Sequence, residues 1–316
     1  MSALEQDTLM RIEVLAEKPS WHVDDLARAA AERGHTLSRC SWLALCASVG
    51  SSQPVVRSDA AILTQTDAII VRTMPVGRLE QVVFRMDTLH RLERAGVCVL
   101  NPPRAMEIAI DKYLALSLLH EAALPVPETI VCQRCVDALA AFEQLGSDIV
   151  LKPIFGSEGF GLTRITDRDL AARAFTQLER MGSVIYVQRF IPTSEGDDPG
   201  GTDLRLFVIG DRVVAAMRRH SSDWRANVAR GAKAEAFDAD ESLQTLAVKA
   251  AAACHTPVAG VDILVDAAGK PWLLEVNASP GWKAIAKATG VDIAEHIVSH
   301  IESRVQAAKE TARVVT

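Results

Sequence analysis

The sequence predicts a chain of mixed α/β and α+β class, in which a parallel α/β domain comes first and mixed sheets follow. Short apolar runs alternate with helical patterns over residues 11–104, which is the rhythm of strands covered by helices. Further along, residues 149–161 and 261–281 place charged side chains, amides and glycines directly beside apolar strands. These two stretches indicate a ligand site built on sheets.

In the first segment, residues 1–104, strands are expected at 11–16, 67–71 and 97–100, and helices at 23–33 and 79–95. Gly34 and Gly96 follow the two helices as stop signals. The run Asn101-Pro-Pro103 ends the segment, because proline removes a backbone donor and restricts the residue before it. A dinucleotide site is not expected here, since no Gly-x-Gly-x-x-Gly turn follows the first strand.

The middle segment, residues 105–190, opens with a helix that Asp111 caps and that closes at Leu124-Pro-Val-Pro127. The pattern then predicts a strand at 149–152, a glycine-rich loop, a helix at 167–181 and a strand at 184–188.

The last segment, residues 191–316, begins with a turn-rich insertion at 194–201. The later elements that its pattern predicts are strands at 204–209, 212–217, 261–265 and 273–277, helices at 243–253 and 293–303, and a polar tail after 306.

Three oxygen-bearing side chains are expected to converge on the last two strands. Asp262 lies near the start of one strand, and Glu275 and Asn277 lie two residues apart on the next, so they share one face. Such polar groups among apolar neighbours are costly without partners. Hard oxygen ligands suit Mg²⁺ held between protein and nucleotide phosphates.

A cationic region is expected opposite this cluster. Lys152 ends an apolar strand and precedes Gly156, Gly159 and Gly161, whose backbone amides can approach phosphates closely. A lysine at that place can also simply reach solvent, and this alternative stays open. Further cationic and amide groups are Arg205, Arg225, Asn227 and Arg230. Metal ligands, lysine and glycine loop together predict an ATP-dependent ligase.

Composition agrees with an ordinary enzyme of the cytoplasm. The chain has 316 residues, a formal net charge of −6, 49% hydrophobic and 23% charged residues. The negative charge disfavours sequence-independent nucleic-acid binding. No apolar run approaches the roughly 18 residues of a membrane helix, and the N-terminus lacks a signal-like core. The pair Cys132-x-x-Cys135 has ligand spacing without a second pair, so reduced thiols near a strand end are expected.

The chain resembles the ATP-grasp superfamily and, within it, the RimK-like α-L-glutamate ligases. The resemblance covers about residues 101–300. The motifs that carry it are Asp111-Lys112, Leu124–Pro127, Leu151–Gly161, Asp203–Arg205, Val213–Met217, Ala259–Leu264, Leu274–Gly281 and Ala288–Ala294.

The resemblance implies an ATP-grasp fold with an N-terminal pre-ATP-grasp, Rossmann-like domain (1–104), a central subdomain (105–190) and a C-terminal subdomain (191–316). It also implies a reaction in which a carboxylate is phosphorylated by ATP and an amine displaces phosphate. The implied ATP-binding residues are Lys112, Lys152, Gly156, Ser157, Gly159, Gly161, Gln188, Arg189, Phe190, Ile191 and Asp203. The implied catalytic residues are Arg205, Arg225, Asn227 and Arg230. The implied ligands of Mg²⁺ or Mn²⁺, two ions that Glu275 bridges, are Asp262, Glu275 and Asn277.

Substrate contacts are expected from Ser279, Gly281, Trp282 and Lys283, which follow the metal strand. Trp282-Lys-Ala284 stands where the family often has Leu-Glu-Gly, which resembles relatives that glutamylate pterin-type cofactors. A second interpretation makes Trp282 a core residue and Lys283 a solvated one. Arg189 also departs from the family, which usually has glutamate there, and Ala226 stands where serine is common.

The expected reactants are L-glutamate and a small-molecule carboxylate, and a homo-oligomer, dimer or tetramer, is expected. Glutamylation of a ribosomal-protein C-terminus and dipeptide ligation remain alternatives, because the loops that line acceptor pockets are not readable from sequence. A non-catalytic ATP-binding module would be expected to lose metal ligands, and all three are present.

Overall fold

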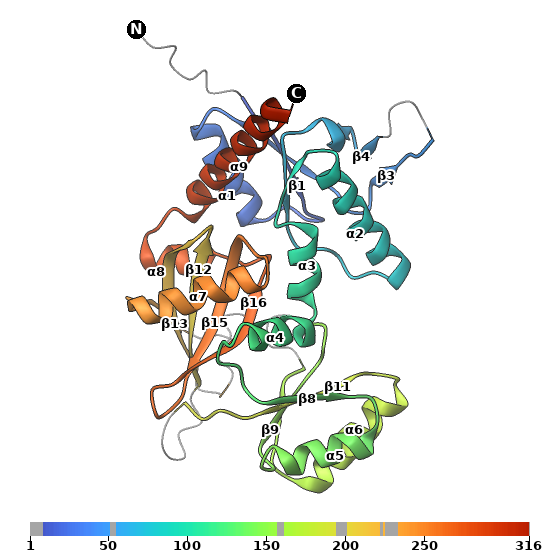
Figure 1. Cartoon of the computed structure of the whole chain (residues 1–316), viewed down its shortest axis with the longest axis vertical. Helices are drawn as coiled ribbons and strands as arrows, with labels where there is room; N and C mark the ends of the chain where they lie inside the picture. The colour runs from blue at the N-terminus through green and yellow to red at the C-terminus, as the bar shows by residue number, and fades with distance from the viewer. Residues whose placement is uncertain are drawn as a thin grey trace.

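The computed structural model describes residues 9–50, 55–156, 161–193, 201–221, 224 and 233–315. Its sheets follow one another along the long axis of the molecule (Figure 1). Each of the three segments of the sequence contributes one main sheet, and a small three-stranded sheet accompanies the first. Among the described helices, none is both long and apolar enough to cross a membrane.

The first sheet is parallel, as the alternation of strands and helices predicted. Its strand order is β2-β1-β6-β7. Ser20 caps the first helix, because its side chain accepts a hydrogen bond from the amide of Val23. The elements of this part are β1 (Arg11–Leu15), α1 (Trp21–Glu32), β2 (Thr36–Cys40), β3 (Leu45–Ala47), β4 (Val56–Ser58), β5 (Ala61–Ile62), η1 (Leu63–Gln65), β6 (Ala68–Val71), α2 (Leu79–Arg94) and β7 (Cys98–Leu100).

The sequence analysis missed β2 and the small sheet β3-β4-β5. Strand β2 lies at the edge of the first sheet, and Cys40 alone of its five residues is buried. An edge strand with so little buried surface carries a weak hydrophobic pattern. The small sheet is built from strands of two or three residues, which are too short for a periodic signal.

Two helices connect the first and second sheets, α3 (Pro103–Ile110) and α4 (Lys112–Glu121). Pro103 ends the preceding segment as predicted, and it also occupies the first turn of α3, where a proline lacks no needed hydrogen bond. Helix α3 was not predicted. Asp111 caps α4 as predicted, since its side chain accepts from the amides of Tyr113 and Leu114 at 2.9 and 3.0 Å.

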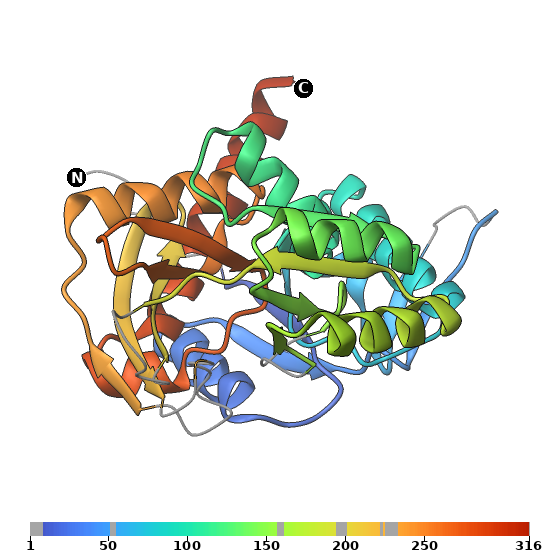
Figure 2. The same cartoon turned by 90° about the horizontal axis from the view of Figure 1, so that it is seen from below.

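The second sheet is antiparallel, with the order β10-β9-β11-β8 and two helices on one face (Figure 2). Cys132 ends β8 and Cys135 begins α5, and both thiols are free, as expected. The elements are β8 (Thr129–Cys132), α5 (Cys135–Gln144), β9 (Ile149–Lys152), β10 (Thr163–Ile165), α6 (Arg168–Arg180) and β11 (Ile185–Arg189).

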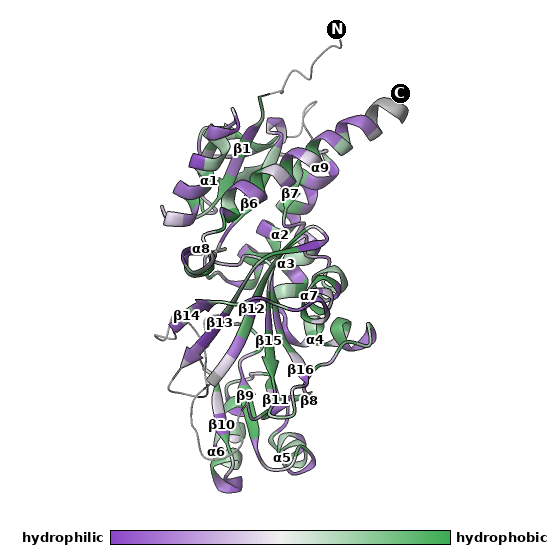
Figure 3. Ribbon diagram, turned by 90° about the vertical axis from the view of Figure 1, so that its left-hand side faces the viewer, coloured by the Kyte–Doolittle hydropathy of each residue, from purple (hydrophilic) through white to green (hydrophobic). Residues whose placement is uncertain are grey.

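The third sheet is the largest, with antiparallel order β14-β13-β12-β15-β16. In Figure 3 its central strands are mainly hydrophobic, whereas β14 at the edge is hydrophilic. The elements are β12 (Gly201–Ile209), β13 (Arg212–Ser221), β14 (Lys233–Ala236), α7 (Glu241–Ala253), β15 (Val258–Val265), β16 (Pro271–Asn277), α8 (Lys283–Thr289) and α9 (Ile293–Val315).

Both faces of the third sheet are buried, which explains the continuous apolar run in β12. Leu206 and Val208 pack with Ala247 of α7, whereas Phe207 and Ile209 belong to a core shared with α9 and the first sheet. Successive side chains of a strand point to opposite faces, so the two sets alternate.

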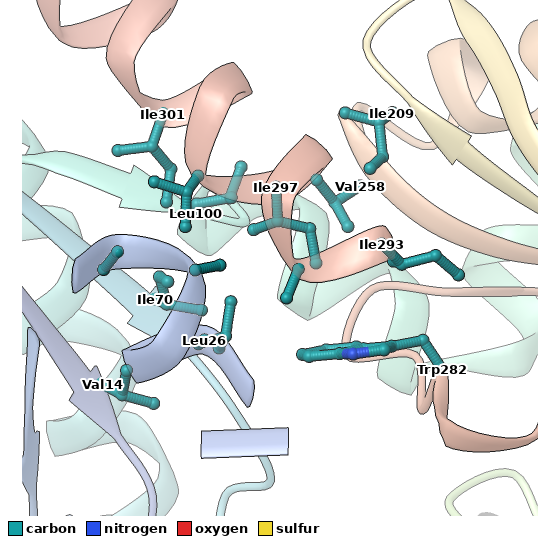
Figure 4. Close-up of a cluster of buried hydrophobic side chains, with 14 of the residues drawn as sticks. Val14, Leu26, Ile70, Leu100, Ile209, Val258, Trp282, Ile293, Ile297 and Ile301 are labelled. Atoms are coloured by element: carbon teal, nitrogen blue, oxygen red, sulfur yellow. The ribbon is translucent and has the colours of Figure 1, made fainter. Parts of the chain in front are cut away.

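The last helix, α9, packs the C-terminal part of the chain against the first domain. Ile293, Ile297 and Ile301 of α9 lie between Leu26 of α1 and the third sheet (Figure 4). Arg33 reinforces this packing with ion pairs to Glu295 and Glu302. Helix α9 continues to Val315, beyond the predicted end at 303, because Ala, Lys, Glu and Arg there are strong helix formers. Residues 306–311 are exposed, which agrees with the polar tail predicted after residue 306. The domain boundaries at 104 and 190 stay predictions.

Candidate active site

Two carboxylates face each other on adjacent strands of the third sheet. Asp262 of β15 lies opposite Glu275 of β16 in an antiparallel pair, and a bulge follows Asp262 directly. Asn277, opposite Gly260, turns its side-chain oxygen onto the amide of Ser279 at 2.8 Å. Asp262 is buried, and burial and the charge of Asp262 raise the pKa of Glu275. The three predicted metal ligands therefore lie on two neighbouring strands.

This donor set fits a divalent cation. The buried carboxylate of Asp262 and the half-buried carboxylate of Glu275 repel each other, and a hard cation that binds their oxygens relieves that repulsion. Within the described ranges, His, Cys, Asp and Glu alone form no group of three or more, so the amide of Asn277 is needed to complete a set of three. The metal role of these residues stays a prediction.

An arginine network holds Asp262. Arg205 of β12 donates to both carboxylate oxygens of Asp262 at 2.7 Å, and Arg219 of β13 donates at 2.5 Å to each oxygen of Asp203 and lies 3.0 Å from Asp262. Although burial raises the pKa of Asp262, the charges of Arg205 and Arg219 outweigh it and lower the pKa to about 2. Burial raises the pKa of Asp203 to about 6. Sequence reasoning missed Arg219, whose partner Asp203 is far away in the chain but directly opposite in the sheet.

Asp203 was predicted to face the nucleotide. Both of its side-chain oxygens accept from Arg219 instead, and the residue is 7% exposed. In this structure its carboxylate thus serves the ion-pair network that orients Asp262.

Two lysines approach the carboxylates from the second sheet and α4. Lys152 is the last residue of β9, and burial lowers its pKa to about 8 while the charge of Glu275 raises it. Lys112 begins α4, and its ammonium donates to the carbonyl of Gly156 at 2.6 Å. Burial likewise lowers the pKa of Lys112, and the charge of Glu275 raises it. Both predicted lysines therefore share the electrostatic neighbourhood of Glu275.

The glycine-rich loop between β9 and β10 is described at its two ends. Gly156 and Gly161 have φ angles of +151° and +78°, which L side chains rarely adopt. A Cβ at either position would lie 3.3 Å from the ring of Pro153. Ser157 and Gly159 lie outside the described residues.

The predicted adenine hinge follows β11. Gln188 is buried and donates to the hydroxyl of Thr129 at 2.9 Å. Arg189, which replaces the usual glutamate, pairs on the surface with Glu128 at 2.5 Å, so its charge is directed to a neighbouring strand. The ring of Phe190 lies 3.6 Å below the guanidinium of Arg164. Ile191 follows β11 and is half-buried.

Three of the predicted catalytic residues, Arg225, Asn227 and Arg230, lie outside the described residues, as does most of the insertion at 194–201. Their roles stay predictions.

The expectation that Trp282 contacts the substrate is wrong, and the second interpretation, that it is a core residue, is correct. Its indole is 1% exposed, belongs to the core shared with α9, and donates to Asp25 at 2.9 Å. Lys283 is exposed and lies 5.7 Å from the centre of the Trp21 ring. The interpretation of Trp282 as core and Lys283 as solvated is the one that holds. Sequence reasoning also missed Arg72 and His22, which contact this loop from the first domain.

The three sheets, with Lys112 of α4, Lys152 of the second sheet and the carboxylates of the third, have the arrangement expected of an ATP-grasp ligase. A family model described as the RimK-like ATP-grasp domain matches residues 109–301, and one described as the RimK PreATP-grasp domain matches residues 10–106.

Individual proteins are similar over nearly the whole chain. The tetrahydromethanopterin:α-L-glutamate ligase of Methanosarcina acetivorans is 30% identical over 322 residues, covering 92% of this chain and 97% of that protein. A probable α-L-glutamate ligase of Legionella pneumophila is 33% identical over 300 residues, covering 93% and 96%. The structure of the ATP-grasp ligase PsnB with a minimal precursor is similar with a TM-score of 0.73 and 23% identity, covering 95% and 99%.

The chain therefore belongs to the RimK-like ATP-grasp family, and it is an ADP-forming carbon–nitrogen ligase. The predicted family and fold are confirmed.

Proposed function

We propose that the protein adds L-glutamate to a small-molecule carboxylate, such as a pterin-type cofactor, with ATP as the source of energy. The observation that carries the proposal is the interaction of Lys112 of α4 and Lys152 of the second sheet with Glu275 of the third sheet, which lies opposite Asp262. Cations on one side and metal-type oxygen ligands on the other are what a nucleotide triphosphate needs.

The reaction has two balanced steps. An oxygen of the substrate carboxylate attacks the γ-phosphorus of ATP, the bond to the β-phosphate oxygen breaks, and ADP leaves. The amine nitrogen of glutamate then attacks the carbonyl carbon of the acyl phosphate, loses a proton, and phosphate leaves with the electron pair of the broken C–O bond.

The residues of this chain bind and orient the reactants. Lys112 and Lys152 hold phosphate oxygens, and Arg205 fixes the orientation of Asp262. Asp262, Glu275 and Asn277 would hold Mg²⁺ or Mn²⁺, two ions in our proposal, and bound metal neutralises the charge of the transferred phosphoryl group.

The names of relatives support the substrate class. The similar protein of Methanosarcina acetivorans is named for glutamate ligation to tetrahydromethanopterin, and a structure of PsnB is described in complex with the precursor peptide PsnA2. A peptide acceptor, including a ribosomal-protein C-terminus or a dipeptide product, is therefore the second candidate. A non-catalytic module is disfavoured, because all three predicted metal ligands, Asp262, Glu275 and Asn277, are present on two neighbouring strands. We further propose that the enzyme works in the cytoplasm as a homo-oligomer.

The test is a screen for ADP release that depends on glutamate and on a panel of carboxylates, with mass spectrometry of the product. Pterin carboxylates and peptides ending in free carboxylates form the panel, and Glu275→Gln is the inactive control. When the substrate carboxylate that supports ADP release is labelled with ¹⁸O, the label is expected in inorganic phosphate. Formation of AMP and pyrophosphate would refute the acyl phosphate, and a peptide substrate would favour the second candidate.

A further inference from the structure

A buried arginine of the first domain lies against the loop that follows the metal strand. Arg72 comes directly after β6, is 9% exposed, and donates to the carbonyl of Pro280 at 2.8 Å. Its guanidinium carbon lies 4.8 Å from the centre of the Trp282 ring. Among the described residues no carboxylate forms an ion pair with Arg72, and burial lowers its pKa to about 10. A buried cation without an anionic partner is costly unless a ligand supplies the anion.

The described groups around Arg72 offer it no free carboxylate. Burial and the charge of Arg72 lower the pKa of His22 to about 4, so this imidazole is neutral at pH 7. Its Nε2 accepts from the amide of Trp282 at 3.2 Å, which places the ring proton on Nδ1. The acid in the neighbourhood, Asp25, is already engaged, because it accepts from Trp282 and pairs with Arg28. The charge balance therefore favours an anion.

An independent observation comes from the loop itself. The hydroxyl of Ser279, next to Pro280, is buried and has no hydrogen-bond partner among the described residues. An unpaired buried hydroxyl costs about 1–3 kcal/mol. The hydroxyl hydrogen of a serine turns about the Cβ–Oγ bond, so a carboxylate bound at this loop can accept its hydrogen bond.

The loop also connects Arg72 to the reaction centre. A Cβ added at Gly260 would lie 3.0 Å from the Pro280 ring and 3.7 Å from Nε of Arg205, which holds Asp262. Arg72 thus binds the carbonyl of Pro280, whose ring lies close to Gly260 of β15, the strand that also carries Asp262. Arg72 also follows the carboxyl end of a parallel strand, the edge at which ligands of such sheets bind.

We propose that Arg72 and Ser279 bind a carboxylate of the incoming amino acid. This proposal rests on the proposed ligase function. The amine nucleophile glutamate carries two carboxylates, whereas the carboxylate that ATP phosphorylates lies at the lysines. A guanidinium gives a carboxylate two parallel hydrogen bonds and fixes the direction of the attached amine. Arg72, a residue of the first domain, would then select for an amino acid that carries this carboxylate.

The test compares Arg72→Lys, Ser279→Ala and the control Arg94→Lys, which changes an exposed arginine of α2 in the same way. L-Glutamate binding is measured by calorimetry with ADP and Mg²⁺ present, and KM values are measured with the carboxylate found by the ADP-release screen. Arg72→Lys is expected to raise the KM and Kd for glutamate at least tenfold and Ser279→Ala about threefold. The KM for ATP is expected to stay within twofold in both variants, with unchanged circular dichroism, and Arg94→Lys is expected to change none of these constants.

Two amides of glutamate, each lacking one of its carboxylates, show which of the two carboxylates binds Arg72. The wild-type enzyme is expected to discriminate strongly against either glutamine or the α-amide of glutamate, and Arg72→Lys is expected to lose that discrimination. Equal glutamate KM values in wild type and both variants would overturn this inference while the ligase function stands. A wild-type protein that binds no amino acid and releases no ADP would overturn the ligase function as well.

Discussion

The charge of Lys152 is expected to lower the stability of the nucleotide-free protein and to strengthen ATP binding. Replacing Lys152 by methionine tests both effects. The drop in the pKa of Lys152 from its usual 10.5 to about 8 corresponds to about 3 kcal/mol of unfavourable burial of the ammonium. This is a net figure, because the shifted pKa already includes the attraction to Glu275 and the repulsion by Lys112. Methionine keeps an unbranched stem of similar length without the charge. We therefore expect Lys152→Met to stabilise the nucleotide-free protein by about 1–3 kcal/mol at pH 7.

The same substitution is expected to weaken ATP binding at least tenfold, because a charge-assisted contact to phosphate contributes about 1.5–3 kcal/mol. Chemical denaturation without nucleotide measures the first effect, and calorimetry with a non-hydrolysable ATP analogue and Mg²⁺ measures the second. Lys249→Met, on the exposed side of α7, is the matched control and should change neither. If Lys152→Met leaves both stability and nucleotide affinity unchanged, the side chain reaches solvent and the reasoning is wrong.

The other predictions concern the carboxylates, the arginine network and pH. Glu275→Gln should abolish ADP release without lowering the thermal midpoint, since it removes a charge that burial and Asp262 already disfavour; near-normal turnover would exclude a metal role. EDTA should stop the wild-type reaction and added Mg²⁺ or Mn²⁺ should restore it, as followed by ADP release. Arg219→Met should cost about 3–5 kcal/mol in denaturation, because it leaves Asp203 and Asp262 buried without their shared partner, whereas Arg218→Met on the surface should cost under about 1. Between pH 8 and 10.5 the unfolded chain binds the Lys152 proton and the folded chain has lost it, so stability should gain a contribution that rises with pH, and Lys152→Met should lack it.

Local spacing was sufficient to find the carboxylates and the lysines. Glu275 and Asn277 share a face because strand side chains alternate, and Asp262 lies opposite Glu275 because the two strands are joined antiparallel neighbours. Lys152 was identifiable because a charged residue and glycines directly follow an apolar strand. Each of these patterns is confined to one strand or to two consecutive strands of the sequence.

Arg219 and Arg72 carried no such signal. Arg219 lies in β13 among other charged residues. Only the register of the sheet, which places it opposite Asp203, shows that it forms an ion pair there. Arg72 follows an ordinary apolar strand, and its partner Pro280 lies 208 residues away. Trp282 was assigned to substrate for the same reason, because the helix that covers it, α9, returns from the far end of the chain.

By itself the sequence determined the family, the parallel first sheet, most longer strands and helices, and the residues that carry the charge of the site. Those properties follow from hydrophobic period, caps and turn residues, which act over one element at a time. The tertiary structure alone decided which charges pair, which aromatic side chains are buried, and that the first domain reaches the loop after the metal strand. Pairing and burial depend on the register of strands distant in sequence and on the packing of α9 against two sheets, and no local pattern encodes either.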